Sequence, residues 1–387
     1  MSEKRHANIG GWFPSTYPES RSRFCKRLSE LTIRWPNATL NEQALPGQEG
    51  LALDWIAADA LESPLNLLII TAGLHGIEGY VGSAVTQLFL DEFLPLLTPA
   101  HTGLRLVHAI NPWGMSHWKR SNPANVDLNR NFVFASADVG DATFTPVQNP
   151  LYPRLRQLLE PKQPVRASRL SNFKLYLQIL AAVMKIGATG LQEAGLRGQS
   201  LSQQGIYYSG TGYQPETKIM MGLYRKWLAA YERVLLVDIH SGYGPRYQMS
   251  LVLSNQEEKS SAYFRDSLFY PRIVKNNTEE FYQIQGDMVD YLYRLKHRDF
   301  PDKRLFALAF EFGTFGDSTL ALMRSLRCTI QINQLAWNGA ATVEDERKIL
   351  KEYQELFYPG ESAWRNKALD DARQAFGGIL KAHRLIE

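Results

Sequence analysis

The feature of the sequence that most constrains the fold is a series of short apolar segments, each followed directly by polar or charged residues. Four segments are typical of buried β-strands by length and composition: residues 66–70, 104–110, 233–240 and 305–310. Between the first two, residues 80–94 repeat apolar side chains at helical spacing. Strands that alternate with helices predict a parallel sheet with helices packed on its faces.

The remaining segments extend this α/β pattern. Residues 51–57 alternate apolar and polar side chains and predict an edge strand, and residues 249–253 predict another short strand. Helices are expected at residues 20–32, 172–186, 215–231 and 286–295, and from Ser318 to the end of the chain. We expect one α/β domain over residues 1–387, with a mostly parallel or mixed central sheet and helices on both faces. Residues 133–205 predict an inserted cap of helices and loops, and residues 318–387 predict C-terminal helices.

Composition excludes several classes of protein. The chain has 387 residues, 44% of them hydrophobic, so it can bury a large core. Its formal net charge is only +4, and no concentrated basic stripe indicates a nucleic-acid partner. Cys25 and Cys328 form neither a disulfide framework nor a thiolate metal site. Without a signal peptide or an apolar run of about 18 residues, the sequence predicts a cytoplasmic protein with no membrane partner.

Polar residues at the ends of the predicted strands form a candidate metal site. His75 and Glu78 are three residues apart at the start of the predicted helix, so they project from one face. His240 ends another strand, and Asp238, two positions earlier, points to the same side of it. Two imidazoles and one carboxylate are a ligand set of catalytic zinc, which keeps a fourth position open. Glu311 follows the last predicted strand, where it is placed to act as a general base.

Taken singly, each of these residues has a plainer interpretation. A histidine after a strand is more often a hydrogen-bonded polar residue than a ligand, and Glu78 also suits the first turn of a helix. Glu311 could be the buried partner of a lysine or an arginine. The carboxyl ends of parallel strands, however, meet at one edge of a sheet, where α/β proteins build their sites. The joint occurrence of these residues at strand ends therefore favours the metal site.

A polar, turn-rich segment, residues 117–132, starts at the same predicted edge of the sheet. It contains Arg120 and Arg130 among several asparagines, and guanidinium groups match the geometry of a carboxylate. The plainer alternative is that both arginines are solvated. Tyr208 and Tyr213 lie in a later turn, where they either line the rim of a cleft or pack within the turn.

Several motifs occur in a fixed order: His75-Gly-Ile-Glu78, Asn111-Pro-Trp-Gly114, Arg120, Val126-Asp127-Leu-Asn129-Arg130-Asn131-Phe132, Asp238-Ile-His240-Ser and Phe310-Glu311. This order resembles that of the zinc carboxypeptidases, the metallocarboxypeptidase or funnelin superfamily. Gly205-Ile-Tyr-Tyr208-Ser-Gly210-Thr-Gly and His240-Ser-Gly-Tyr-Gly look like a bacterial branch that is usually described as a domain of unknown function. The resemblance covers about residues 50–320 and, through the branch, nearly the whole chain.

The resemblance implies a role for each motif residue. His75, Glu78 and His240 would bind one zinc ion, which lowers the pKa of water and polarises a carbonyl. Glu311 would act as general base and acid, and Arg120 would stabilise the developing oxyanion.

The resemblance also implies the residues around this centre. Asn129 and Arg130 would bind the terminal carboxylate of the substrate. Tyr208 is expected to be a further substrate contact from its position in the later turn, apart from the resemblance. Asp127 would orient His75 by accepting a hydrogen bond. Asp238 is expected to support His240 in the same way, because residues two apart in a strand share a face.

Two features depart from the resemblance. The interval from Arg130 to His240 is longer than in the well-known carboxypeptidases, so the inserted segment is expected to narrow or reshape the cleft. Those enzymes also carry a mobile tyrosine before the catalytic glutamate. Tyr282, Tyr291 and Tyr293 lie in that region, and no local motif selects one of them.

The sequence leaves three hypotheses for function. The first is a zinc metallocarboxypeptidase acting on a peptide or peptide-like substrate with a free carboxylate. The second is an N-acyl amino acid deacylase of the aspartoacylase or succinylglutamate desuccinylase type, whose substrate carries the same carboxylate. The third is a zinc-binding protein without turnover. Oligomeric state is not indicated by the sequence.

Overall fold

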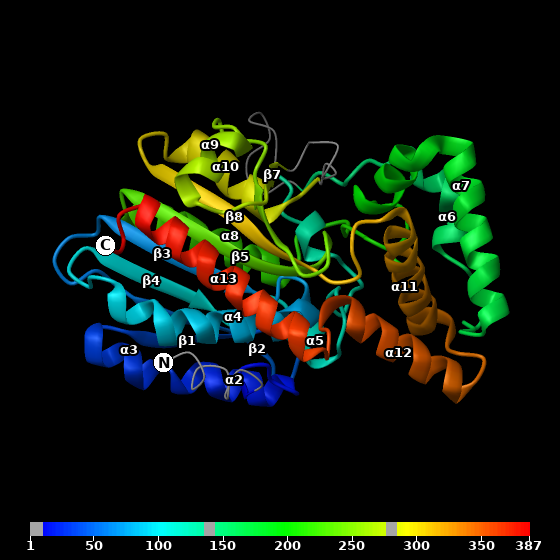
Figure 1. Ribbon diagram of the computed structural model, residues 1–387, viewed down its shortest axis with the longest axis horizontal. Helices are drawn as coiled ribbons and strands as arrows, with labels where there is room; N and C mark the ends of the chain where they lie inside the picture. Colours follow the sequence, from blue (N-terminus) through cyan, green and yellow to red (C-terminus); the bar gives the residue numbers. More distant parts are fainter. Residues whose placement is uncertain (1–10, 135–143, 276–284) are drawn as a thin grey trace.

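The centre of the fold is a mixed β-sheet, seen in the computed structural model of the chain, which describes residues 11–134, 144–275 and 285–387 (Figure 1). In this part of the chain the sheet has eight strands in the order β1-β2-β4-β3-β5-β8-β6-β7. Their bounds are β1 Thr39–Ala44, β2 Ala52–Ala58, β3 Asn66–Ala72, β4 Thr102–Val107, β5 Arg233–Gly242, β6 Met249–Leu253, β7 Ile273–Lys275 and β8 Arg304–Gly313.

The four predicted buried strands are the inner strands of this sheet. β4, β3, β5 and β8 lie side by side and parallel, whereas β2 and β6 join them antiparallel on either side. β3 is buried along its whole length after Asn66, as expected for a strand covered on both faces. The predicted mixed α/β sheet is therefore confirmed.

The prediction of an edge strand at residues 51–57 is wrong. β2 is hydrogen-bonded on both sides, to β4 and to β1. β1 is the true edge, and its sequence, TLNEQA, is polar and almost entirely exposed. Because an edge strand with one solvated side needs few apolar residues, β1 lacks the alternation by which strands are recognised.

Helices cover both faces of the sheet, because alternate residues of the inner strands point to opposite sides. Leu68 and Ile70 pack with one group of helices, and Leu67 and Ile69 with the other. The first group is α2 Tyr17–Lys26, α4 Gly79–Glu92, α9 Ser261–Leu268 and α13 Ser362–Ala382; the second is α8 Pro215–Ala230 and α10 Met288–Asp299. The single helix expected at residues 20–32 is instead two, α2 and α3 Leu28–Arg34, which meet at Arg27.

The remaining helices gather at one end of the molecule, beyond the carboxyl ends of the parallel strands (Figure 1). They are α6 Tyr152–Leu159, α7 Arg169–Leu196, α11 Thr319–Asn338 and α12 Val343–Phe357. α7 contacts α6 and α11, and α11 contacts α12. We call α6, α7 and α11 the cap; it thus combines part of the expected insertion with a helix from the C-terminal group.

One of the described helices, α7, is long and apolar enough to cross a membrane by length and composition alone. Only 17% of its most apolar stretch is buried, so it is not a core helix of the ordinary kind. A left-handed residue, Gly187, with φ of 77°, interrupts its regular backbone.

Candidate metal centre

His75 and Glu78 are positioned by a tight crossing of two loops at the end of β3. His75 precedes a single 3-10 turn, η2 Gly76–Glu78, which leads directly into α4. A Cβ atom on Gly76 would lie 2.1 Å from the carbonyl carbon of Gly114, so only glycine fits there. The side chain of Asn111 accepts a hydrogen bond from the Gly114 amide at 2.8 Å and so caps α5 Pro112–Ser116. The motifs His75-Gly-Ile-Glu78 and Asn111-Pro-Trp-Gly114 therefore pack directly against one another.

The same crossing brings Arg120 to the metal ligands. The amides of Gly76 and Ile77 donate hydrogen bonds to the carbonyls of Arg120 (3.2 Å) and Lys119 (2.9 Å). The guanidinium of Arg120 then reaches Glu78 Oε1 at 2.9 Å and Asp127 Oδ2 at 3.1 Å. Residues that are distant in the chain thus meet where β3 ends.

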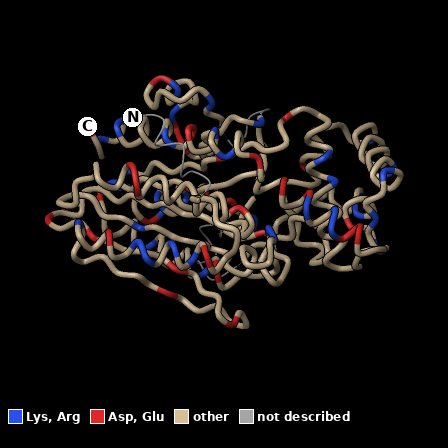
Figure 2. Tube along the Cα trace, turned by 60° about the horizontal axis from the view of Figure 1, so that its bottom comes forward, with Lys and Arg blue, Asp and Glu red and all other residues tan. Residues whose placement is uncertain are grey.

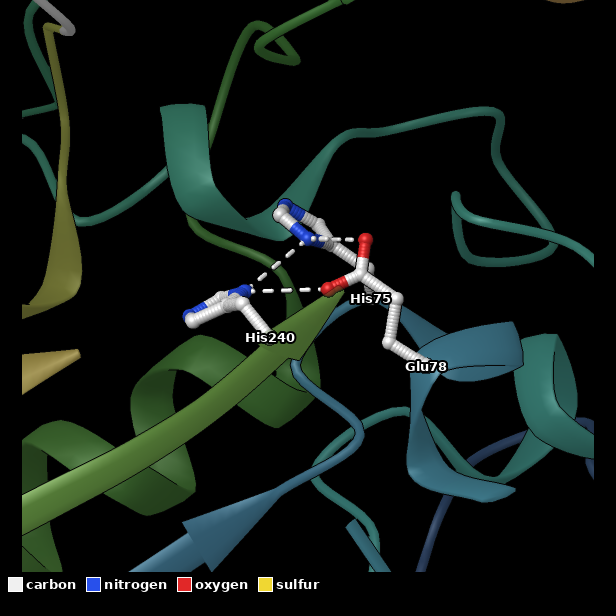
Figure 3. Close-up of side chains that lie close together, drawn as sticks. All are labelled: His75, Glu78 and His240. Carbon is white, nitrogen blue, oxygen red and sulfur yellow. Dashed lines mark hydrogen bonds and ion pairs between the residues drawn. The ribbon is translucent and has the colours of Figure 1, made fainter. Parts of the chain in front are cut away.

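The three expected ligands converge on one point, as Figure 3 shows. His75 Nδ1 lies 3.0 Å from Glu78 Oε1, and His240 Nδ1 lies 3.1 Å from Glu78 Oε2. The two Nδ1 atoms are 3.3 Å apart. All three residues are buried, and their ligand atoms lie within 4.8 Å of one another. This arrangement fits a single metal ion.

Each ligand imidazole is oriented by a carboxylate at its other nitrogen. His240 Nε2 lies 2.5 Å from Asp238 Oδ2, and Asp238 in turn accepts a hydrogen bond from Thr71 Oγ1 at 2.6 Å. His75 Nε2 lies 3.1 Å from Asp127 Oδ1. An ionised carboxylate has no hydrogen to donate, so the ring nitrogen that faces it must carry one. These contacts therefore place the hydrogen on Nε2 and leave the lone pair on Nδ1.

Arg120 Nη2 also approaches His75 Nε2, at 2.7 Å, and this contact favours the opposite tautomer. We assign the hydrogen to Nε2 because Arg120 has two carboxylates to which it donates, whereas Asp127 can only accept. Lone pairs of both Nδ1 atoms and of Glu78 then converge with no hydrogen between them. A bound cation satisfies all three, so the donor set fits a metal.

The charges around the centre favour a cation as well. Burial by itself would lower the pKa of His240, but Asp238 and Glu78 raise it well above its ordinary value. Burial by itself would raise the pKa of Glu78, but His75, His240 and Arg120 hold it below its ordinary value. The Glu78 carboxylate therefore remains ionised and favours positive charge at the centre.

Glu311 lies beside the ligands but does not belong to them. It is directly opposite His240 in the register of β5 and β8, and its Oε1 accepts a hydrogen bond from the Tyr243 amide at 3.0 Å. Burial, followed by the charge of Glu78, raises the pKa of Glu311 to about 8. A carboxyl group with a pKa near neutrality can both accept and return a proton.

A cavity of about 220 Å³ lies between the ligands and the cap. Its floor is formed by His75, His240, Glu311, Arg120 and Asn129. The cap closes it with α7 and α11, which contribute Ile179, Val183, Leu191, Met323 and Leu326 among others. The floor is thus polar and charged, whereas the roof is mainly apolar.

The two residues expected to bind a terminal carboxylate lie in different places. Asn129 lines the cavity, where its Nδ2 donates to Asp287 Oδ2 at 3.0 Å and its Oδ1 accepts from the Met288 amide at 2.9 Å. Arg130 is fully buried and does not line the cavity. Its guanidinium donates twice to the carbonyl of Leu196, at 2.9 and 2.6 Å, and so binds the C-terminal end of α7.

Of the adjacent pair Tyr207 and Tyr208, it is Tyr207 that lines the cavity. Tyr208 packs in the hydrophobic core, and its backbone bridges to Val126 and Gln199. Tyr207 adopts a left-handed backbone with φ of 51°, which turns its side chain to the cavity. Its ring lies 5.6 Å from the Arg120 guanidinium and 5.5 Å from that of Arg130. The sequence gives no signal for which of the two adjacent tyrosines faces the cavity, because this depends on the left-handed backbone of Tyr207.

The other tyrosines named from the sequence stand outside the cavity or outside the described residues. Tyr213 donates a hydrogen bond to the Val133 carbonyl at 2.7 Å. This contact matches the alternative in which Tyr213 packs within its turn. Tyr291 and Tyr293 are buried in the core, and Tyr282 lies outside the described residues. Tyr243, which sequence reasoning missed, lines the cavity next to Glu311. Its place one residue after the His240-Ser-Gly run was the signal that could have found it.

No curated protein matches this chain. Among solved structures, bovine thrombin-activatable fibrinolysis inhibitor in complex with tick carboxypeptidase inhibitor is 15% identical, with 81% of this chain and 95% of that chain covered and a TM-score of 0.45. Carboxypeptidase A from Helicoverpa armigera is 14% identical, with coverage of 86% and 73% and a TM-score of 0.43. An aspartoacylase family protein from Mesorhizobium loti is 15% identical, with coverage of 78% and 67% and a TM-score of 0.36.

A family described as a protein of unknown function, DUF2817, matches residues 13–371, which is most of the chain. The matched range contains every residue of the candidate metal centre and of the cap. The chain belongs to the DUF2817 family.

Proposed function

We propose that the protein is a zinc-dependent hydrolase that cleaves an amide bond next to a terminal carboxylate, as a metallocarboxypeptidase does. The observation that carries the proposal is the convergence of His75 Nδ1, His240 Nδ1 and the Glu78 carboxylate at the floor of a cavity that also holds Glu311. Two imidazoles and one carboxylate are a catalytic zinc donor set, since they leave a coordination position open. A purely structural zinc site would be closed by a fourth protein ligand.

The residues divide the chemistry among them. Zinc, when bound, lowers the pKa of water and polarises a carbonyl. Glu311 takes a proton from the attacking water on its carboxylate and delivers it to the leaving nitrogen. Asp127 and Asp238 hold the imidazoles in the tautomer that ligation requires.

Arg120 and Asn129 are the polar groups that would orient the substrate. Arg120 is the arginine of the cavity floor, where its charge favours both a terminal carboxylate and a developing oxyanion. Asn129 supplies an amide at the same surface. Arg130 joins this pair only if its two hydrogen bonds to Leu196 break, so its proposed role as a carboxylate ligand requires a rearrangement of its side chain or of the end of α7.

The test is the Glu311→Gln variant of the zinc-loaded protein, assayed on a mixed pool of short peptides and N-acyl amino acids by mass spectrometry. We expect turnover to fall by about 10²- to 10⁴-fold with no loss of bound zinc, because Glu311 moves protons but is not a ligand. Glu232→Gln, an exposed carboxylate, is the matched control and should keep full activity. Equal turnover by both variants would exclude Glu311 as the base. If the wild type kept its zinc but cleaved no substrate in the pool, the hypothesis of a zinc-binding protein without turnover would remain.

The apolar roof of the cavity favours a second candidate, an N-acyl amino acid deacylase. The side chains Ile179, Val183, Leu191, Met323 and Leu326 would contact the part of the substrate that lies away from the charged floor. An acyl chain buries apolar surface there, whereas a peptide backbone would leave polar groups without partners. The carboxylate of the released amino acid would lie at the floor in both cases.

A substrate series separates the two candidates. N-acyl derivatives of one amino acid, differing in chain length, are compared with peptides that end in the same amino acid. Leu326→Trp narrows the roof and should slow long acyl substrates more than short ones, whereas Leu320→Trp, an exposed residue of the same helix, should not. Cleavage of the peptides alone would identify a carboxypeptidase and exclude the deacylase.

A further inference from the structure

The outer face of α7 carries an apolar stripe that no described part of the chain covers. Leu170, Phe173, Leu177, Leu180 and Met184 are 45% to 75% exposed. Their spacing of three and four residues places them on one side of the helix over about 21 Å. Single exposed apolar residues are ordinary, but a continuous stripe of five indicates a surface that binds something.

The inner face explains why the stripe is held outwards. Ile179, Ala182 and Leu191 pack with α6 and with Ile330 of α11. α7 is therefore fixed by its other side, and the stripe cannot turn inwards without losing that packing. For the same reason the helix would lie on a surface and not pass through one.

The charges that α7 itself carries along the stripe are all of one sign. Arg169, Lys174 and Lys185 are exposed on α7, and the sequence has no acidic residue between Arg169 and Gln192. Figure 2 shows α7 at the right-hand edge of the molecule with few charged residues along it. An apolar helix face with basic residues on its flanks and no acidic residue along the stripe matches the pattern of helices that lie in the interface of an anionic bilayer.

A second copy of the chain is the competing occupant, since the spacing of the stripe also suits a coiled coil. In such a pair, however, the positions that flank the stripe would bring lysines of one copy toward lysines or neutral residues of the other. Helix pairs of this kind gain their specificity from opposite charges, and like charges across the contact are destabilising. The charge pattern therefore favours lipid over a second copy.

We propose that the outer face of α7 docks on the surface of an anionic phospholipid bilayer. Leucine, phenylalanine and methionine side chains enter the acyl boundary, and the lysine and arginine side chains extend to the headgroups. The inner face of the same helix forms part of the cavity roof, so docking brings that roof next to the lipid. The proposal does not depend on which amide the protein cleaves.

The test is sedimentation of the full-length protein with vesicles of phosphatidylcholine mixed with phosphatidylserine, and with vesicles of phosphatidylcholine alone. We expect binding to the mixed vesicles that weakens with salt, and at least about tenfold weaker binding by Leu177→Glu/Leu180→Glu. Leu61→Glu/Leu96→Glu changes two exposed leucines elsewhere and should bind as the wild type does. Lys174→Glu/Lys185→Glu should remove the preference for phosphatidylserine.

Light scattering on the same variants decides between the occupants, and circular dichroism verifies that each is folded. A wild-type dimer that the α7 variant converts to a monomer would overturn the proposal and assign the stripe to a second copy. Absence of vesicle binding, or equal binding by the two leucine variants, would overturn it as well. Binding that depends on the stripe and on phosphatidylserine would establish it.

Discussion

At the scale of single residues, the carboxylates behind the ligands are as testable as the ligands themselves. Asp238→Asn keeps the shape of the side chain but can donate to Nε2 of His240, which moves the ring hydrogen to Nδ1. We expect zinc affinity to fall by about 10- to 100-fold, measured by competition with a chelator. Asp266→Asn, at an exposed position, should leave the affinity unchanged. An Asp238→Asn variant with wild-type affinity would contradict the tautomer assigned here.

A second residue-scale prediction concerns His108, far from the metal centre. It is buried, its Nε2 is 2.7 Å from Ser20 Oγ, and burial lowers its pKa from 6.5 to about 3. Between these values the unfolded chain binds a proton that the folded chain does not, so stability is lost as the pH falls from 6.5 towards 3.

The size of this effect follows from the difference in pKa. The contribution of His108 is complete above pH 6.5 and decreases on acidification by at most about 5 kcal/mol. Urea unfolding of the wild type and of His108→Asn at several pH values measures it, with the exposed His117→Asn as control. We expect a shallower pH dependence in His108→Asn alone. Parallel curves for all three proteins would show that His108 does not titrate differently in the folded state.

At the scale of elements, replacing a glycine inside a helix by alanine tests how closely that helix packs on the sheet. A Cβ atom on Gly82 of α4 would lie 2.4 Å from Ala72 Cβ of β3, so Gly82→Ala forces the helix away from the sheet. Gly222 of α8 has no atom within 4 Å of such a Cβ. Because alanine is the better helix former, Gly222→Ala should stabilise the protein by up to about 1 kcal/mol.

The two glycine variants should therefore move stability in opposite directions. Gly82→Ala is expected to lower the free energy of unfolding by about 1 to 3 kcal/mol, as overpacked core substitutions do. Thermal unfolding of both variants against the wild type is the measurement. If Gly82→Ala were neutral, α4 would not be seated on β3 at the distance described.

At the scale of the whole molecule, the C-terminal helix closes the core around the ends of the strands. Trp364, at the start of α13, is 2% exposed and donates a hydrogen bond from Nε1 to the carbonyl of Gly313 at 2.8 Å. Trp364→Ala leaves a cavity and an unpaired carbonyl two residues after Glu311. We expect it to cost about 3 to 5 kcal/mol in chemical denaturation.

Trp337 provides the matched control for this prediction. It is 41% exposed on α11, in the cap, so Trp337→Ala should change stability by less than about 1 kcal/mol. If Trp337→Ala lowered the free energy of unfolding as much as Trp364→Ala does, Trp337 would have to contribute to packing between the cap and the core.

The sequence by itself determined the inner strands and the residues at their ends. Long apolar runs of β-forming residues identify buried strands, and parallel strands bring their carboxyl ends to one edge whatever their exact order. For that reason the sequence alone predicts that His75, Glu78, His240 and Glu311 lie together at one edge of the sheet. The polar edge strand β1 could not be found, since its side chains face water and carry no apolar pattern.

Only the tertiary structure decided what surrounds those residues. The roof of the cavity combines α7 with α11, which follows it by more than a hundred residues, and packing between distant helices leaves no local pattern. The left-handed backbone at Tyr207 directs the side chain of Tyr207, and not that of Tyr208, to the cavity. Arg130 binds the carbonyl of Leu196 because the folded chain brings the end of α7 next to it. The apolar stripe of α7 resembles a buried helix face in sequence. Its exposure follows from which side of the helix the rest of the molecule already covers, and that depends on contacts between residues far apart in the chain.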